Sequence, residues 1–245
     1  MKLKEEKNNY ELKNLILGYP ADWFIEEQTL NFVRNSIPLI TDFYKSNGIK
    51  DMDLLSKSII KEPLKEVYTT PLFSKNFCNL LVDELKNMEK TIDFKPNNDE
   101  DLLRQIPEIV IEKYCPQLNN SLMHIVDTIL NPIFLNIWNR HVTAGNIQIA
   151  NYNIKEKQQG AWHHDKSSDI SVVVPLNTGD YEGGGTEFFN RGIVKPLPNG
   201  NALMFPSFTH MHKGLPVQSG DRYLLVFWLV CEEETKSNRN YMKNQ

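Results

Sequence analysis

The chain has 245 residues, of which 40% are hydrophobic and 24% are charged, and its formal net charge is −4. This length allows one large domain, or one domain with a small helical extension, and the composition is that of an ordinary globular protein. The slight acidic excess gives no sign of a nucleic-acid partner, and no apolar run reaches the roughly 18 residues of a membrane helix.

The three cysteines, Cys78, Cys115 and Cys231, lie far apart and show no Cys-x-x-Cys spacing. A sparse, odd set of this kind is typical of a reducing compartment, where each cysteine behaves as a small buried apolar residue. The opening stretch "MKLKEEKNNYELKN" also lacks the apolar segment of a secretory signal. We therefore expect a cytoplasmic or nuclear protein.

Helical patterns dominate the first part of the chain, over residues 21–46, 74–90 and 119–141. Pro38 is expected to kink the first stretch and Pro132 to interrupt the third, because proline lacks the amide hydrogen of a helix interior. The second stretch begins with Ser74, a good N-cap, and its apolar residues fall on one face. These residues are Phe77, Leu80, Leu81, Leu85 and Met88.

From about Gly145 onward, short β-rich runs alternate with Gly, Pro, Asn and Asp. The runs span residues 146–154, 169–177, 186–190, 201–206 and 222–231. Several short strands at this spacing indicate an antiparallel sandwich or jelly roll, and helices followed by strands indicate an α+β fold. We predict a helical N-terminal extension over residues 1–60, a main domain over 61–235 and a polar tail over 236–245.

Four of the six histidines fall in two pairs, His163–His164 and His210–His212. A non-haem iron(II) site uses two imidazoles and one carboxylate, and leaves further coordination positions open. Residues i and i+2 of an extended segment point the same way, so the spacing selects His163 with Asp165 and sends His164 to the opposite face. A His-x-Asp triplet alone arises often by chance, so a second feature is needed.

The second pair supplies that feature in "THMHKGLPVQSGDRYLLVFWLV", residues 209–230. If the Gly-Leu-Pro turn joins two antiparallel strands, Arg222 lies beside the second histidine inside the barrel. A buried guanidinium needs a partner, and a planar carboxylate fits its fork of donors. The alternative is a surface arginine at the start of a strand. The nearby stretch "YEGGGTEFF", residues 181–189, is expected to form a tight hairpin.

The triplet at 163–165 and "HKGLPVQSGDR" at 212–222 closely resemble the iron(II)/2-oxoglutarate dioxygenases of the prolyl and lysyl hydroxylase type. The catalytic domain of the procollagen lysyl hydroxylases is most similar, through "HHD", "YEGGG", "TH-x-H-x-GLP" and "G-x-RY". The stretch "KEPLKEVYTTPLFSKNFCNLLVDEL", residues 61–85, resembles the opening of that domain. The resemblance implies a double-stranded β-helix (jelly roll) core with N-terminal and supporting helices, and a dioxygenase domain over 61–235.

Carried over to this chain, the resemblance makes His163, Asp165 and His212 the iron ligands. Arg222 would bind the distal carboxylate of 2-oxoglutarate. Tyr152 occupies the place of a family tyrosine that contacts the same co-substrate, although an amphipathic strand alone would also explain it. His164 and His210 would support the ligands or lie on an outer strand face. Thr186 stands where the lysyl hydroxylases usually have cysteine.

The implied activity is hydroxylation of a lysyl or prolyl side chain in a polypeptide, with release of succinate and CO2. The implied cofactors are Fe(II), 2-oxoglutarate and O2, with ascorbate as a further candidate, and a carboxylate at Asp165 favours hydroxylation over halogenation. The chain has neither a secretory signal nor room for the glycosyltransferase domains of those hydroxylases, so we do not expect collagen as the substrate. A cytosolic protein, a free amino acid and a small metabolite are the alternative substrates. The alternatives are a zinc hydrolase and a non-catalytic jelly-roll binding module.

Overall fold

The computed structural model describes residues 60–89, 95–96 and 105–231 of the chain. The helical stretch predicted at 21–46 lies outside these residues, as do the polar tail and all but the last residue of the predicted N-terminal extension. The proposed domain boundaries therefore stay predictions. The described residues contain the whole segment in which the sequence predicts chemistry.

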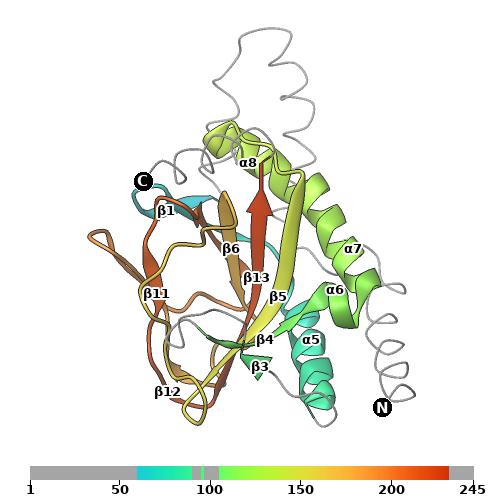
Figure 1. Cartoon of the computed structure of the whole chain (residues 1–245), viewed down its shortest axis with the longest axis vertical. Helices are drawn as coiled ribbons and strands as arrows, with labels where there is room; N and C mark the ends of the chain where they lie inside the picture. Colours follow the sequence, from blue (N-terminus) through green and yellow to red (C-terminus); the bar gives the residue numbers. More distant parts are fainter. Residues whose placement is uncertain (1–59, 90–94, 97–104, 232–245) are drawn as a thin grey trace, which may run out of the picture.

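Eight strands form the main sheet, in the order β1-β2-β10-β6-β13-β5-β4-β3 (Figure 1). All neighbours in this sheet are antiparallel. The two longest strands, β5 and β13, lie side by side near its centre, with Arg222 opposite Tyr152. The strands are β1 (Lys61–Leu64), β2 (Val67–Pro71), β3 (Lys95–Pro96), β4 (Pro107–Val110), β5 (Ala144–Asn153), β6 (Ile170–Pro175), β10 (Asn201–Pro206) and β13 (Asp221–Val230).

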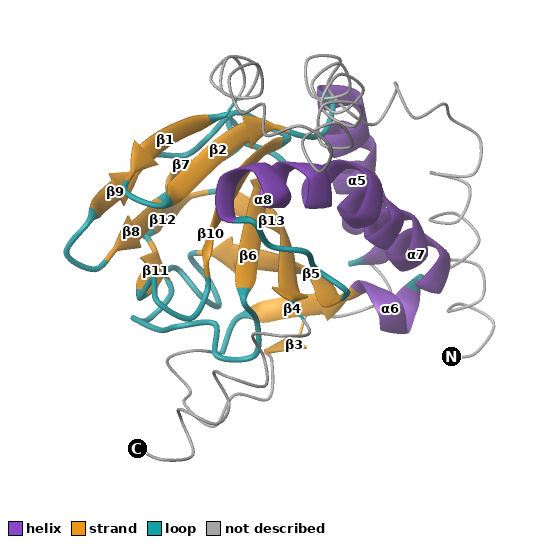
Figure 2. Ribbon diagram, turned by 90° about the horizontal axis from the view of Figure 1, so that it is seen from above, coloured by secondary structure: helices purple, strands orange, loops and turns teal. Residues whose placement is uncertain are grey.

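A second layer of short strands lies on the side of the main sheet away from the helices (Figure 2). It consists of a three-stranded sheet, β11-β8-β9, and a two-stranded sheet, β12-β7. Their bounds are β7 (Glu182–Gly183), β8 (Thr186–Phe188), β9 (Gly192–Val194), β11 (His212–Gly214) and β12 (Val217–Ser219). Two packed antiparallel layers joined by crossing connections form a jelly roll, so the predicted α+β fold is confirmed.

The helices cover the outer face of the main sheet (Figure 2). Ser74 caps α5, because its Oγ accepts a hydrogen bond from Phe77 N at 3.2 Å. The predicted interruption near Pro132 is a π-helical turn, since proline offers no amide hydrogen to the preceding turn. The helical elements are α5 (Lys75–Met88), α6 (Ile111–Tyr114), α7 (Pro116–Ile125), the π-helix η1 (Val126–Leu130) and α8 (Asn131–Trp138).

The apolar face predicted for α5 packs into the main core. Phe77, Leu81 and Leu85 are buried and Leu80 is partly buried, whereas the side chain of Met88 lies outside the described part of the chain. The three cysteines are buried in the same core, as predicted. No helix in the described part of the chain is long and apolar enough to cross a membrane.

Strand β13 is buried on both faces, which explains its nearly unbroken apolar sequence. One set of alternate residues packs with the helices in the main core: Tyr223, Leu225, Phe227 and Leu229. The other set faces the second layer: Arg222, Leu224, Val226 and Trp228. The fold therefore brings Arg222 into the space between the two layers, as the sequence predicted, although not by the expected route.

The two predicted hairpins are not formed. Strand β11 pairs with β8 and β12 pairs with β7, whereas β13 pairs with β5 and β6, so the chain passes from the second layer to the main sheet after β12. Likewise β7 pairs with β12 rather than with β8. The three glycines at 183–185 have φ values of 81°, 75° and 107°, and they allow the chain to cross between the sheets. In a jelly roll, consecutive strands alternate between layers, which local spacing does not reveal.

Candidate active site

His163 and His212 lie directly opposite each other in an antiparallel bridge. His163 N donates to His212 O at 3.0 Å, and His212 N donates to His163 O at 2.9 Å. Residues paired in this way project their side chains to the same face, so the two rings meet with centroids 4.4 Å apart. The backbone pairing therefore brings together two histidines that are 49 positions apart in the sequence (212 − 163).

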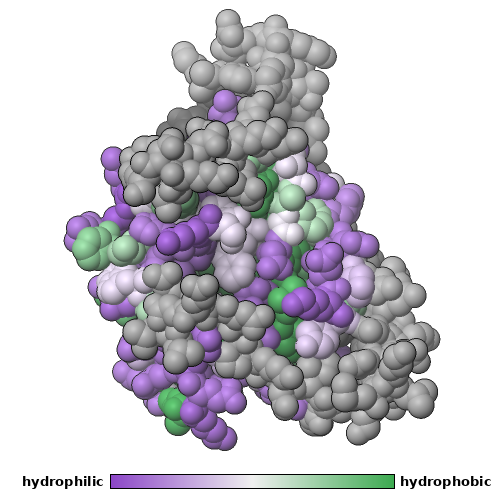
Figure 3. Space-filling view, in the orientation of Figure 1, coloured by the Kyte–Doolittle hydropathy of each residue, from purple (hydrophilic) through white to green (hydrophobic). Residues whose placement is uncertain are grey.

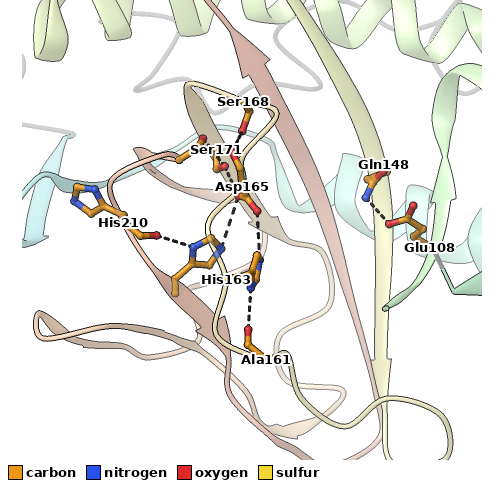
Figure 4. A network of polar contacts seen from close by, with 10 residues as sticks. Glu108, Gln148, Ala161, His163, Asp165, Ser168, Ser171 and His210 are labelled. Carbon is orange, nitrogen blue, oxygen red and sulfur yellow. Dashed lines mark hydrogen bonds and ion pairs between the residues drawn. The ribbon is translucent and has the colours of Figure 1, made fainter. Parts of the chain in front are cut away.

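The carboxylate of Asp165 joins the two imidazoles (Figure 4). Asp165 Oδ1 lies 3.3 Å from His163 Nε2, and Oδ2 lies 3.7 Å from His212 Nε2. All three candidate ligand atoms lie within 4.8 Å of one another. His164 is not part of this group, but it lines the same cavity instead of turning to the opposite face. The reason is a tight turn, in which Lys166 N donates to His164 O and ends the extended segment.

Hydrogen bonds to the backbone set the direction in which both rings can bind a cation. His163 Nδ1 lies 2.8 Å from Ala161 O, and His212 Nδ1 lies 2.9 Å from His210 O. A carbonyl oxygen only accepts, so each Nδ1 carries a proton and each Nε2 is the nitrogen left to bind a cation. When both rings are neutral, their two Nε2 lone pairs face the Asp165 carboxylate. A divalent cation relieves this repulsion, and the donor set of two imidazoles and one carboxylate suits iron(II).

Burial and mutual charge shift the pKa values of the group in opposite ways. Burial lowers the pKa of His212 to about 4, and the nearby charge of Asp165 only partly opposes it. Burial alone would raise the pKa of the Asp165 carboxyl, but His212, His163 and a hydrogen bond from Ser171 outweigh it and bring the pKa to about 2. At neutral pH the group is therefore ready for a metal, with a neutral imidazole beside an ionised carboxylate.

The metal-free protein is expected to lose stability as the pH falls from about 6.5 to about 4.5. In the unfolded chain His212 takes up a proton near pH 6.5, whereas the folded protein resists it until about pH 4, so acid favours unfolding. The full shift corresponds to about 3 kcal/mol of unfolding free energy. Asp165 adds little to this pH dependence. Its pKa is lowered from 3.8 in the folded protein, so its own effect on stability changes with pH mainly below that value.

Urea unfolding of the metal-free protein at about pH 7 and about pH 4.5 measures this loss. The control is His212→Gln, which removes the titrating group and should show a smaller loss between the two pH values. His210, whose pKa burial also lowers, acts in the same direction in both proteins. An equal pH dependence in the two proteins would contradict the assignment to His212.

Two buried hydroxyl groups hold the Asp165 carboxylate in place. Ser171 Oγ donates to Asp165 Oδ2 at 2.5 Å, and Ser207 Oγ lies 2.7 Å from Ser171 Oγ. Ser171 lies on β6, which fixes its backbone position. Both serines are fully buried, so solvent does not compete for these hydrogen bonds. A separate bond from Ser168 Oγ reaches the backbone oxygen of Asp165 at 3.3 Å (Figure 4). Sequence reasoning missed these serines, because hydroxyl residues are common on strands.

We expect Ser171→Ala to weaken metal binding by about 10-fold to 100-fold, because outer hydrogen bonds orient a ligating carboxylate. Calorimetric titration of Fe(II) or Mn(II) into the protein without oxygen measures the affinity. Ser168→Ala is the matched control, since it also removes a hydroxyl group beside Asp165 but leaves the carboxylate bonds intact. Equal metal affinities in the two variants would show that Ser171 does not position the ligand.

His210 supports the site as predicted, but through its backbone. Its carbonyl accepts from His212 Nδ1, while its own ring is fully buried between the Thr209 hydroxyl, 3.0 Å away, and the carbonyl of Lys65, 3.5 Å away. The ring is therefore directed away from the group formed by the other two histidines and Asp165, which selects His212 as the second imidazole.

Arg222 lies in the same cavity as the two imidazoles and Asp165. The residue is 4% exposed, and its Nε and Nη1 atoms are buried without a hydrogen-bond partner among the described residues. Its guanidinium carbon lies 5.6 Å from the ring centroid of Tyr152 and 6.0 Å from that of Tyr181. A side chain on Gly184, which has φ +75°, would approach the arginine to 3.2 Å. These buried guanidinium nitrogens suit a carboxylate, which can accept from both of them.

The cavity has a volume of about 290 Å³ and connects the histidines and Asp165 with Arg222. Tyr152 lines it, and burial raises the pKa of this phenol to about 12 despite the opposing charge of Arg222, so the phenol keeps its proton at neutral pH. Thr186 is buried at the start of β8 and also lines the cavity. Further lining residues, Glu108 and Gln148, were missed by the sequence reasoning, although Gln148 stands out as a polar residue within a predicted strand.

Two family models match the chain. The model of the 2OG-Fe(II) oxygenase superfamily matches residues 147–230, which include His163, Asp165, His212 and Arg222. The model of the OGFOD2-like domain matches residues 24–134. The predicted cofactors, Fe(II) and 2-oxoglutarate, are those of the first family. The residues present fit them, because they provide a two-imidazole, one-carboxylate group and a buried arginine with two nitrogens that have no partner in the described part of the chain.

Curated relatives include hydroxylases of procollagen lysine. The chain is 27% identical over 186 residues to procollagen-lysine,2-oxoglutarate 5-dioxygenase 2 of Homo sapiens, covering 72% of this chain and 25% of that protein. It is 28% identical over 182 residues to the multifunctional procollagen lysine hydroxylase and glycosyltransferase of Caenorhabditis elegans, covering 70% and 25%. The chain thus matches only about a quarter of the length of these relatives.

Solved structures share the fold. A prolyl hydroxylase of Trichoplax adhaerens, in complex with a peptide fragment of hypoxia inducible factor, matches with a TM-score of 0.56 at 17% identity, covering 86% of this chain and 96% of that one. A prolyl-4-hydroxylase of Pseudomonas putida matches with a TM-score of 0.51 at 17% identity, covering 68% and 93%. Residues 147–230 thus form an oxygenase domain of the 2OG-Fe(II) superfamily, in a chain homologous to the procollagen lysine hydroxylases over about 70% of its length.

Proposed function

We propose that the protein is an Fe(II)- and 2-oxoglutarate-dependent dioxygenase that hydroxylates an amino-acid side chain, lysyl or prolyl, in a polypeptide. One observation carries this proposal: a two-histidine, one-aspartate group lines the same cavity of about 290 Å³ as Arg222, whose buried Nε and Nη1 have no hydrogen-bond partner among the described residues. The first feature suits a metal ion with open coordination positions, and the second suits a carboxylate. A co-substrate that chelates a metal at one end and carries a carboxylate at the other end matches both.

In this mechanism His163, Asp165 and His212 hold the iron. When bound, iron(II) supplies the activation of O2 that couples oxidative decarboxylation of 2-oxoglutarate to hydroxylation, with release of succinate and CO2. Arg222 binds the distal carboxylate of the co-substrate with two parallel N–H donors, and the Tyr152 hydroxyl is a further donor on the same side of the cavity.

Part of the cavity wall is apolar. Ala150, Leu224 and Val226 line the space between its polar ends and are almost fully buried. An apolar wall of this kind strengthens the electrostatic attraction between Arg222 and a carboxylate, because it lowers the local dielectric constant.

The substrate class is supported by the relatives. The curated ones carry procollagen lysine in their names, and the Trichoplax adhaerens enzyme is a prolyl hydroxylase with a bound peptide. A zinc hydrolase would use the same ligand types but has no need of Arg222. A non-catalytic binding module is the other alternative, and it has no need of the intact metal-binding set.

The test is an anaerobic titration of Fe(II) into the protein with 2-oxoglutarate. We expect a weak visible charge-transfer band from the chelate, and succinate once oxygen is admitted. Folded, metal-loaded protein that gives no band and no succinate would contradict the oxygenase and favour the binding module. Zinc-dependent hydrolysis without consumption of 2-oxoglutarate would favour the hydrolase.

A further inference from the structure

The guanidinium group of Arg222 lies close to two aromatic rings. Its central carbon is 5.6 Å from the ring centroid of Tyr152 and 6.0 Å from that of Tyr181, which is within the range of a cation–π contact. Its Nε and Nη1 atoms have no hydrogen-bond partner among the described residues. Because hydrogen bonds do not fix these two nitrogens, the position of the guanidinium depends on the side chains packed around it.

The two rings lie on different sides of the arginine. Tyr152 lines the cavity of about 290 Å³ that contains the candidate metal ligands. Tyr181 instead lines a small space of about 20 Å³, and Arg222 lines both. Tyr181 therefore lies behind Arg222, on the side away from the metal-binding group. The small space has room for a single water molecule but not for a guanidinium group, so the arginine cannot move back while the ring is in place.

The Tyr181 ring is held in place by a contact that does not involve Arg222. Its side chain is buried, and its hydroxyl oxygen lies 3.4 Å from Thr178 Oγ1. Thr178 Oγ1 donates its own hydrogen to Leu197 O at 2.7 Å, so toward Tyr181 it can only accept. The phenol hydrogen is therefore directed to Thr178, and the ring itself contacts the guanidinium.

Gly184 lets the backbone come close to both side chains. A Cβ atom at this position would lie 3.1 Å from Tyr181 Cε2 and 3.2 Å from Arg222 Cδ, which is closer than most carbon contacts allow. The residue also has φ +75°, a conformation that glycine adopts without strain. The backbone at Gly184 and the ring of Tyr181 thus form the support against which Arg222 packs.

We propose that Tyr181 and Gly184 are positioning residues that fix the depth of Arg222 and thereby set the length of the 2-oxo diacid that the cavity accepts. This inference rests on the proposed oxygenase function. The metal holds the keto acid end of the co-substrate and Arg222 holds the far carboxylate, so the distance between them selects one chain length. A diacid with one more methylene group fits only if Arg222 moves back, and Tyr181 occupies the space that it would need.

The experiment compares 2-oxoglutarate with 2-oxoadipate, which is one methylene longer, and with 2-oxopentanoate, which has no distal carboxylate. Each compound is titrated calorimetrically, without oxygen, into protein loaded with Mn(II). We expect the unmodified protein to prefer 2-oxoglutarate to 2-oxoadipate by at least about tenfold. In Tyr181→Leu this preference should fall to about threefold or less, because Arg222 can move into the space left by the ring. Tyr181→Phe keeps the ring and should recover most of the preference.

A second variant tests the same support from the backbone side. Gly184→Ala should weaken 2-oxoglutarate by about 10-fold to 100-fold, because the added carbon displaces Arg222, and should leave 2-oxopentanoate unchanged. Gly179→Ala is the matched control. Gly179 also has a positive φ, +108°, but a Cβ atom there meets no other atom within 4 Å, so this variant should bind all three compounds as the unmodified protein does. Gly184→Ala keeps the inference testable if thermal melting shows that Tyr181→Leu does not fold.

Several outcomes would overturn the inference. They are an unchanged preference for 2-oxoglutarate over 2-oxoadipate in Tyr181→Leu, a loss in that variant that is equal for all three compounds, and equal effects of Gly184→Ala and Gly179→Ala. Equal binding of the two diacids by the unmodified protein would also contradict it. Failure of the proposed function is distinct, because the Mn(II)-loaded protein would then bind none of the three keto acids.

Discussion

Replacing Asp165 with alanine is expected to abolish succinate formation and to weaken Fe(II) binding by at least about 100-fold. The substitution removes the only carboxylate of the candidate metal-binding group and leaves two imidazoles. Metal affinity is measured by calorimetric titration without oxygen, and succinate by an end-point assay after oxygen is admitted.

His164→Ala is the matched control for this prediction. His164 lines the same cavity one residue away but lies outside the group of candidate ligand atoms. We expect a change of only a few-fold in its metal affinity. Retained Fe(II) binding in Asp165→Ala, or an equally large loss in His164→Ala, would show that the metal ligands have been misassigned.

The second large effect is expected at Arg222. Arg222→Leu should weaken 2-oxoglutarate by about 30-fold to 1,000-fold, or roughly 2–4 kcal/mol, because it removes a buried, charge-assisted bidentate pair. Arg222→Lys should recover only part of the affinity, since an ammonium group cannot reproduce the planar fork. Calorimetry with Mn(II)-loaded protein measures the affinity.

A co-substrate analogue makes this test specific. 2-Oxopentanoate keeps the keto acid that chelates the metal but lacks the distal carboxylate. The unmodified protein should strongly prefer 2-oxoglutarate, whereas Arg222→Leu should bind both compounds with similar, weak affinity. A variant that kept the full preference would place the distal carboxylate elsewhere in the cavity.

His163 and Asp165 were accessible from sequence because their relative geometry is local, whereas His212 was assigned through the family resemblance. The spacing of His163 and Asp165 follows from the two-residue period of extended chain, and the structure brings these residues together with His212. The strands at β5, β6, β8, β10 and β13 were also predicted, since their apolar, β-branched runs are bounded by turn residues. The interruption before Pro132 was predicted for the same kind of reason: one residue type excludes one local conformation.

What the sequence did not predict depends on which distant segments pair. Glu108 lies in the four-residue strand β4, whose position beside β5 is set by the sheet as a whole. Its hydrogen bond to Gln148 joins residues 40 positions apart, and no periodicity indicates it. The predicted hairpin between His212 and Arg222 was wrong for the same reason, because local spacing predicts a turn but does not say which sheet the next strand joins.

The position of β13 in the sheet has a consequence for how the protein is made. It is the last of the described strands in the chain, yet it lies at the centre of the main sheet, between β6 and β5. During synthesis, the edges of β5 and β6 that pair with β13 therefore stay unpaired until residues 221–230 have left the ribosome. Synthesis that stops before this point leaves a sheet in two halves and no Arg222, so an incomplete chain lacks the fold and the co-substrate site together.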